Sequence, residues 1–99
     1  MKKTNKTDYS TSFHDVVIKT TINELVRVLG EPQFQNNCGE DKVNVEWDCL
    51  NRNGKLVTIY DWKEYRSIGE DEVIEFHLGS KNPIDGIEGK LELVELLKK

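Results

Sequence analysis

The clearest pattern in the chain is a helical repeat of apolar side chains over residues 21–29. The apolar residues stand at positions i, i+3, i+4 and i+7, on one face of a helix: Ile22, Leu25, Val26 and Leu29. Thr21 and Glu24 fit a capping box, in which the threonine hydroxyl and the glutamate three residues later satisfy free backbone donors. Gly30 favours the left-handed conformation that ends a helix, and Pro32 prevents its continuation. We therefore predict a helix over residues 21–29.

A period of two, typical of half-buried strands, marks two segments that a turn connects. Residues 43–49 alternate apolar and polar side chains, and residues 56–62 are rich in β-branched and aromatic residues. Asn53 and Gly54 between them can adopt the positive φ angles of a tight turn. The two segments are therefore predicted to form a β-hairpin.

Two further strands and a second helix complete the predicted fold. Residues 73–78 alternate in the same way, and the β-branched run within residues 13–20 favours an edge strand or an extended lead-in. Apolar residues within 91–97 predict a C-terminal helix, after proline and two glycines at 82–89 that we expect to break the chain. The prediction is an α+β domain with a three- to four-stranded antiparallel sheet, two helices packed on one face and the order (β)-α-β-β-β-α.

The length and the charge limit the classes of protein that the chain can belong to. Ninety-nine residues suit one domain, and we assign residues 1–12, which are polar and aperiodic, to a flexible N-terminal tail and residues 13–99 to a single α+β domain. The net charge is −4, and the lysines and arginines are interleaved with acidic residues. Direct DNA binding is not expected, because it requires a basic stripe that neutralises phosphates.

The two cysteines, Cys38 and Cys49, lack the CxxC spacing, and a secreted domain of this size usually carries more. No signal peptide precedes the predicted fold, and no apolar run is long enough to span a membrane. We therefore expect a cytoplasmic protein with reduced thiols. The spacing of the cysteines and histidines matches no zinc motif, so we expect neither a metal nor a cofactor.

The strand alternation also predicts which side chains share a face of the sheet. The apolar face, which the helices have to cover, carries Val45, Trp47, Val57, Ile59, Ile74 and Phe76. The opposite face then presents Glu46, Asp48, Thr58, Tyr60, Trp62, Glu75 and His77. A register slip of one residue would exchange the two faces.

Residues 60–63 (Tyr-Asp-Trp-Lys) are the first candidate for a ligand-binding site. Tyr60 and Trp62 share one face and form a flat aromatic surface on which a nucleotide base could stack, and Lys63 could reach a phosphate. The competing interpretation is that both aromatic side chains pack in the core or at an oligomer interface, as aromatic residues in strands usually do. Asp61 alternates to the buried side and would need hydrogen-bond donors there, such as the backbone amides of a turn.

Glu46, Asp48 and His77 extend the candidate site along the same face. Glu46 and Asp48 lie two residues apart on one strand, about 7 Å from one another, and carboxylates so placed can bind a metal or take part in acid–base chemistry. His77 could act as a general base or contact a ligand. The competing interpretations are a solvated strand face and a hydrogen-bonded surface histidine. Without a nucleophile or a metal motif, we predict no catalytic residue and no metal ligand. We assign to ligand binding Tyr60, Trp62, Lys63, His77, Glu46 and Asp48.

Four segments, in this order, carry a resemblance to a known family. They are KTTINELVRVLGEP from residue 19, VEWD from residue 45, TIYDWKEYR from residue 58 and FHLG from residue 76. Together they resemble a small protein family of unknown function that recurs in tailed-phage genomes. The family pattern often has a tryptophan before the histidine and a second glycine after the first, where this chain has Phe76 and Ser80. The resemblance implies a phage-encoded accessory protein, and such proteins often act on host processes or host defence.

These observations favour a non-catalytic phage accessory protein that binds a small molecule or nucleotide and sequesters a host immune signal, as an anti-defence protein. The alternative is a protein–protein inhibitor that docks the same face on a host enzyme or defence protein. A third possibility is a small hydrolase that uses His77 with Glu46 or Asp48. We expect a homodimer or higher homo-oligomer, because one copy can hardly shield an uncovered aromatic face and unpaired strand edges. A phage-encoded chain would act in the cytoplasm of the host cell.

Overall fold

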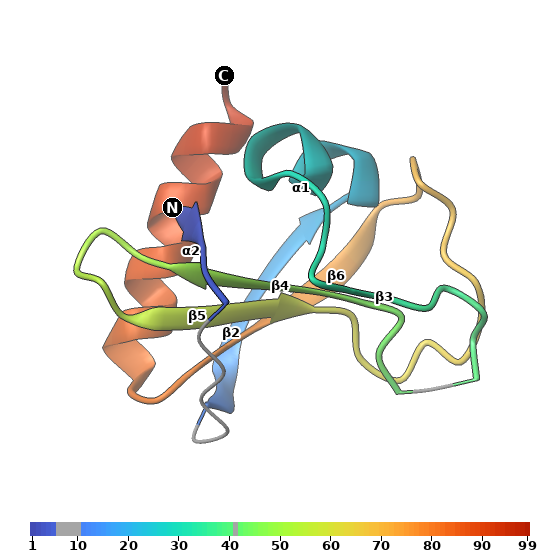
Figure 1. Ribbon diagram of the computed structural model, residues 1–99, viewed down its shortest axis with the longest axis horizontal. Coiled ribbons are helices and arrows are strands. Elements are labelled where there is room, and N and C mark those ends of the chain that lie inside the picture. Colours follow the sequence, from blue (N-terminus) through green and yellow to red (C-terminus); the bar gives the residue numbers. More distant parts are fainter. Residues whose placement is uncertain (6–10, 41) are drawn as a thin grey trace.

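The computed structural model describes residues 1–5, 11–40 and 42–99 (Figure 1). Its elements follow the order β1 (Lys2–Lys3), β2 (Ser12–Thr20), α1 (Ile22–Leu29), β3 (Phe34–Gln35), β4 (Val45–Leu50), β5 (Leu56–Tyr60), β6 (Ile74–Ser80) and α2 (Pro83–Leu97). The α+β class and the antiparallel sheet are confirmed. Of the predicted N-terminal tail, residues 6–10 lie outside the described residues. In the part of the chain that the structure describes, no helix has the length and apolar character needed to cross a membrane.

Within the described residues, the sheet has six strands instead of the predicted three to four. The strand order is β1-β4-β5-β6-β2, and β3 also pairs with β4. Lys3 of β1 pairs with Cys49 near the end of β4, and Phe34 of β3 pairs with Glu46 near its start, so two short strands share one edge of β4. Each is two residues long, and a strand so short has no period that the sequence could show. The predicted order (β)-α-β-β-β-α therefore missed β1, which lies in the segment predicted as a flexible tail, and β3, which lies between the predicted helix 21–29 and the predicted hairpin.

Helix α1 begins and ends as its sequence predicted. Thr21 is the N-cap residue, and its Oγ1 accepts a hydrogen bond of 3.0 Å from the backbone N–H of Glu24. The carboxylate of Glu24 forms an ion pair with Arg27, one turn further on, instead of completing the capping box. At the other end, Gly30 has a φ of 87° and donates its N–H to the carbonyl of Val26. These local contacts define both ends of α1.

Helix α2 begins well before the start that the sequence predicted. We expected a helix over residues 91–97 because Gly86 and Gly89 usually interrupt helices, but both glycines lie inside α2. A Cβ atom on Gly89 would lie 2.9 Å from Cγ2 of Val57, and a Cβ atom on Gly86 would lie 3.0 Å from Oγ of Ser80. The glycines therefore allow the helix backbone to approach the sheet closely, and they do not mark a break.

Strands β4 and β5 form the predicted hairpin. Leu50 pairs with Leu56 where the strands meet the turn. Oδ1 of Asn51 accepts a hydrogen bond of 2.9 Å from the backbone N–H of Asn53, and Gly54 has a φ of 74°. The side chain of Asn51 thus stabilises the turn from within, as turn asparagines commonly do.

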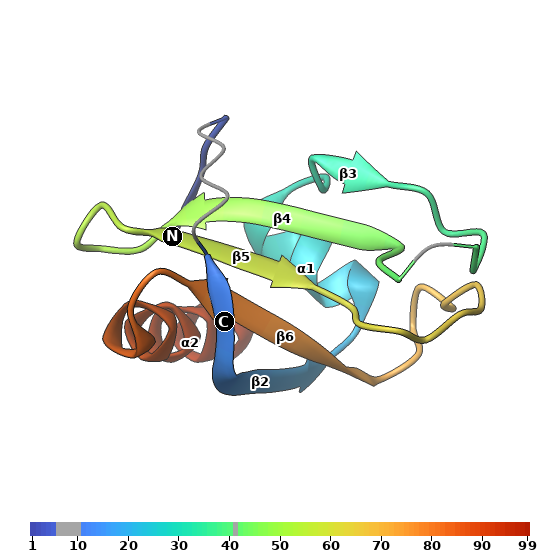
Figure 2. The same cartoon turned by 90° about the horizontal axis from the view of Figure 1, so that it is seen from below.

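The predicted faces of the sheet are also confirmed. Every residue assigned to the apolar face is buried: Val45, Trp47, Val57, Ile59, Ile74 and Phe76. Trp47 donates its Nε1–H to the carbonyl of Gly30 at the end of α1, at 2.8 Å, and α2 packs on the same face over Val57. Figure 2 shows the sheet from the side away from α1. We call this side, which carries the predicted site residues, the open face.

Strand β2 is bent by a bulge between Phe13 and Val17. Asp15, inside the bulge, has a φ of 63°, in the left-handed region that residues other than glycine rarely adopt. Val17 pairs with His77, whereas Phe13 pairs with Gly79. Because of the bulge, the ring of Phe13 comes to lie against His77 on the open face.

Candidate functional site

Strand pairing sets three predicted site residues side by side on the open face. Tyr60 in β5 pairs with Glu46 in β4 and with His77 in β6. Directly paired residues of antiparallel strands point to the same face, with their Cβ atoms about 4.5–5.5 Å apart. Asp48 lies two residues along β4 and therefore shares the face of Glu46. The register confirms the common face that the alternation predicted for these residues.

Four aromatic rings meet there and form what we call the aromatic cluster: Phe13, Tyr60, Trp62 and His77. The ring of His77 stacks on Phe13 with centroids 4.0 Å apart, and it lies 6.4 Å from the ring of Trp62. Tyr60 meets Trp62 and His77 edge-on, at 6.1 Å and 5.6 Å. Such stacked and edge-to-face contacts are the arrangements that aromatic rings prefer. Trp62 is 41% exposed, so it is not a core residue.

Two lysines lie beside the exposed indole. The Nζ atoms of Lys63 and Lys42 lie 5.6 Å and 5.9 Å from the centroid of the Trp62 ring, within the range of cation–π contacts. Their backbones are joined as well, because the N–H of Lys63 donates to the carbonyl of Lys42 at 2.7 Å. The site thus combines a flat π-surface with two positive charges.

Phe13 and Lys42 are site residues that the sequence analysis missed. The sequence placed Phe13 at the start of a possible strand but assigned it to neither face of the sheet, because a bulge leaves no signal in the apolar pattern. Lys42 lies in a polar loop without period, and only its tertiary hydrogen bond to Lys63 brings it to Trp62. Lys63, which was predicted to reach a phosphate, lies in the loop that follows β5.

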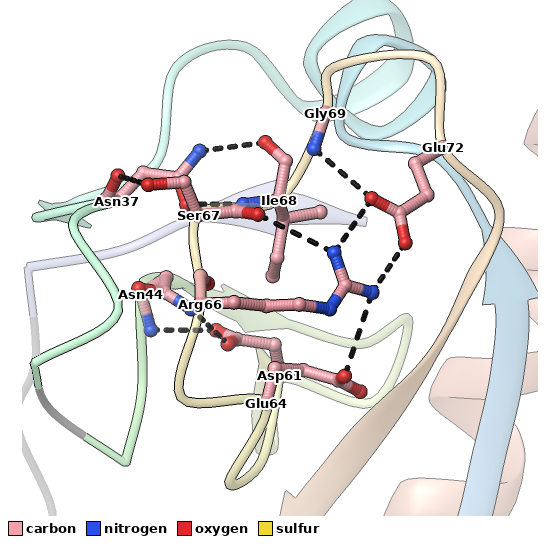
Figure 3. Close-up of polar contacts among 9 residues, drawn as sticks. All are labelled: Asn37, Asn44, Asp61, Glu64, Arg66, Ser67, Ile68, Gly69 and Glu72. Atoms are coloured by element: carbon pink, nitrogen blue, oxygen red, sulfur yellow. Dashed lines mark hydrogen bonds and ion pairs between the residues drawn. The ribbon is translucent and has the colours of Figure 1, made fainter.

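A buried hydrogen-bond network holds the chain on both sides of Trp62 (Figure 3). The carboxylate of Asp61 has no exposed surface and accepts three hydrogen bonds. Two come from the backbone N–H groups of Asn44 and Val45, at 2.8 Å and 3.0 Å, and the third comes from the side-chain amide of Asn44, at 2.9 Å. The same amide also donates to the carbonyl of Arg66 at 3.1 Å. Asp61 thus finds the amide donors that its buried position required.

The network continues into the loop that follows Trp62. Asn37 pairs with Ile68 through two hydrogen bonds of 2.7 Å, and the guanidinium of Arg66 forms an ion pair with Glu72 (Figure 3). Lys63, within this loop, has a φ of 55°. A residue other than glycine persists in this region only where its surroundings impose the conformation, and such residues cluster at functional sites. The network holds the chain at Asp61 and at Arg66, on both sides of Lys63.

The carboxyl groups of Glu46 and Asp48 form a pair that holds a proton near neutral pH. Burial raises the pKa of Glu46 to about 7, and a hydrogen bond to Asp48 and the charge of Asp48 act in the same direction. Oδ1 of Asp48 is buried and finds no hydrogen-bond donor among the described residues. Protonated Glu46 supplies a donor to Asp48. Burial, followed by the charge of Glu46, also raises the pKa of the neighbouring Tyr60.

The geometry around His77 does not fit a general base. Burial lowers the pKa of His77 below 6.5, against the smaller opposing effect of Glu75. In the described part of the chain, no carboxylate lies within hydrogen-bonding distance of its ring. His77 is therefore a neutral ring stacked between aromatic neighbours at physiological pH, and its contribution to the site is its flat surface.

A hollow of about 330 Å³ lies at the other end of the open face. It is lined in part by Leu50, Leu56 and Lys81, and none of the six predicted site residues lines it. The paired Leu50 and Leu56 stand four residues along the strands from Glu46 and Tyr60, a distance of about 13 Å. Among the described residues, no three His, Cys, Asp or Glu side chains are grouped so as to hold a metal ion.

Comparison with known proteins does not assign a function to this site, so its interpretation depends on its chemistry. No family model matches the chain, no curated protein is similar to it in sequence, and no solved structure matches it. The resemblance to a tailed-phage family therefore stays a prediction.

Proposed function

We propose that the open face binds a planar, anionic small molecule, and that a nucleotide is the class of ligand that fits best. The observation that carries this proposal is the exposed side chain of Trp62 with the Nζ atoms of Lys42 and Lys63 at 5.9 Å and 5.6 Å from its ring centroid. A base stacked on an aromatic side chain contributes about 1–3 kcal/mol to binding whatever its identity. Two ammonium groups next to the ring would neutralise a phosphate of the same molecule.

The carboxyl pair supplies the polar groups that orient such a ligand. Glu46 and Asp48 lie on the same face as the aromatic cluster and hold a donor and an acceptor near neutral pH. Binding sites of small molecules commonly combine a mainly apolar surface with a few fixed polar groups. Binding without catalysis is the function that we propose, because no carboxylate of the described residues forms a hydrogen bond or ion pair with His77. For a phage-encoded chain, the corresponding role would be to sequester a nucleotide signal of host defence.

The test is isothermal titration calorimetry with AMP and GMP at low ionic strength. We expect Trp62→Ala to raise the Kd roughly tenfold or more, because one stacked base is lost. Lys63→Gln should weaken binding and reduce its salt dependence. Tyr65→Ala is the matched control, because Tyr65 is an exposed aromatic residue of the same loop outside the aromatic cluster. Equal binding by wild type and Trp62→Ala, with both proteins folded by their melting curves, would end the proposal.

The same titration separates binding from hydrolysis. After incubation the protein is denatured and the nucleotide is analysed by chromatography. A sequestering protein returns the nucleotide unchanged, whereas accumulation of a hydrolysed product would favour the hydrolase that uses His77 with Glu46 or Asp48.

A protein–protein inhibitor is the second candidate function, and one observation favours it. Phe34 in β3 is exposed and pairs with Glu46, which places its ring on the open face together with the aromatic cluster. An exposed apolar side chain in addition to the aromatic cluster enlarges the apolar part of the open face, and large apolar patches mark docking sites for proteins. Phe34→Ala discriminates between the two functions, since it should weaken the binding of a protein partner and leave the Kd for AMP and GMP unchanged.

A further inference from the structure

Helix α2 carries a second apolar face that the described part of the domain does not cover. Ile84, Ile87 and Leu91 are 57%, 45% and 54% exposed. The opposite side of the helix packs on the sheet through Gly86 and Gly89. Figure 2 shows α2 at the margin of the molecule, beside β6. The exposed side chains are therefore not needed for the packing of α2 on its own sheet.

The spacing of these residues is that of a two-stranded coiled coil. Ile84, Ile87 and Leu91 follow one another at intervals of three and four residues, and the partly buried Val94 adds a further interval of three. This repeat fills the a and d positions of a heptad, with residues 84 and 91 at a and residues 87 and 94 at d. We call these four residues the α2 stripe. Val94 also packs against the core of its own domain. A helix that only covers its own domain has one apolar face, and the exposed Ile84, Ile87 and Leu91 add a second one.

The charged residues beside the stripe favour a parallel pair of helices. Lys90 occupies position g and Glu95 the following position e, and neither has an ion-pair partner among the described residues. In a parallel pair, residue g of one helix lies next to residue e of the following heptad in the other, so Lys90 would meet Glu95 of the partner subunit. An antiparallel pair centred on the stripe would set Glu88 against Glu88 of the partner subunit and Lys90 against Lys90 of the partner subunit.

We propose that the chain forms a parallel, two-fold homodimer through the α2 stripe. A second copy is the partner because a parallel pair places identical positions against one another, and both the stripe and its Lys90–Glu95 flank are complementary to themselves. Glu88 and Lys90 lie on either side of the stripe. These charged residues keep the apolar contact narrow, so that it suits two helices and not three or four. Helix α2 is already formed in the domain, so the association does not have to nucleate it. The open face lies on the other side of the sheet and takes no part in this contact.

Sedimentation equilibrium at low ionic strength tests the dimer. Leu91→Glu places a carboxylate at the centre of the seam in both subunits and should raise the dimer Kd about a hundredfold. Val73→Glu is the matched control, because Val73 is 65% exposed and lies outside α2, and it should leave the Kd unchanged. Circular dichroism confirms that both variants are folded. A wild-type monomer at every concentration up to about millimolar, or a dimer that Leu91→Glu leaves intact, would overturn the proposal.

Charge exchange tests the orientation of the helices. Lys90→Glu and Glu95→Lys each replace two attractive pairs by repulsive ones and should raise the Kd about tenfold. The double variant restores the attraction in a parallel dimer and should return the Kd close to that of the wild type. Failure of the double variant to recover would refute the parallel arrangement, as would a trimer or larger assembly. An association weakened by Trp62→Ala instead would place the interface on the aromatic cluster and refute the use of α2.

Discussion

Replacement of Asp61 by asparagine tests the buried network that positions Trp62. The substitution keeps the size of the side chain and removes one acceptor oxygen and the negative charge. In the wild type, the buried carboxylate accepts hydrogen bonds from the backbone N–H groups of Asn44 and Val45 and from the side-chain amide of Asn44. Each of these donors is shielded from water, so a lost acceptor cannot be replaced by solvent.

The magnitude follows from counting donors and acceptors. The single oxygen of an asparagine at position 61 can keep both backbone N–H donors. Its own NH₂ group then faces the NH₂ group of Asn44, and one buried hydrogen bond is lost. A buried donor left without an acceptor costs about 1–3 kcal/mol, and the two retained bonds weaken because the acceptor is no longer charged. We expect a net loss of about 2–4 kcal/mol, a large part of the roughly 5–15 kcal/mol that stabilise a domain.

Urea denaturation followed by circular dichroism measures this loss. Glu70→Gln is the control, since it makes the same chemical change on an exposed side chain and should shift the free energy of unfolding by no more than about 0.5 kcal/mol. Asn44→Ala combined with Asp61→Asn should be clearly non-additive, because the two residues share hydrogen bonds. An Asp61→Asn protein within about 0.5 kcal/mol of the wild type would refute the reasoning, and so would strict additivity with Asn44→Ala.

Three further substitutions test other parts of the fold, each by urea denaturation. Thr21→Ala removes the N-cap acceptor of α1 and should cost about 1 kcal/mol; unchanged stability would mean that the hydroxyl does not cap the helix. Gly89→Ala places a Cβ atom 2.9 Å from Cγ2 of Val57 and should cost about 1–3 kcal/mol, although alanine is the better helix former; a gain in stability would contradict the close approach of α2. Burial and Asp48 raise the pKa of Glu46 from 4.5 to about 7, so the stability that its protonated form contributes is complete below 4.5 and is lost as the pH rises through about 7. Glu46→Gln, which does not ionise, should remove a decrease of about 1–2 kcal/mol between about pH 5 and about pH 8, after allowance for solvent screening; an identical decrease in the variant would assign it to another group.

The elements that could be predicted are those whose signals lie within a few residues of one another. Thr21 and Gly30 define α1 because capping is a contact between a residue and the adjacent helical turn. Gly54 marks the hairpin turn because its φ of 74° is one that glycine adopts readily, whereas Asn53, for which a positive φ was also expected, does not adopt one. The alternation along β4 placed Glu46 on the open face, since a strand reverses its side chains at every residue.

The site could be predicted only to the extent that it depends on this alternation. Tyr60 and His77 share a face because they pair across neighbouring strands. Trp62, predicted to lie within a strand over residues 56–62, follows the end of β5 at Tyr60, and the structure nevertheless brings its ring to the other two. The sequence did not indicate Phe13, which reaches His77 through a bulge in β2, or Lys42, which reaches Trp62 through a loop. The positions of both side chains depend on contacts between segments that are far apart in the chain.

Tertiary packing also decided the start of α2 and the proton on the carboxyl pair. Gly86 and Gly89 disfavour a helix by their own backbone entropy, yet both lie inside α2, where the absence of a side chain lets the helix pack closely on the sheet. The pKa of Glu46 depends on burial and on the distance to Asp48, neither of which exists in an unfolded chain. Short-range preferences act on residues within one turn or one hairpin and can be recognised in the sequence. Steric exclusion, burial and charge proximity arise only when distant segments meet.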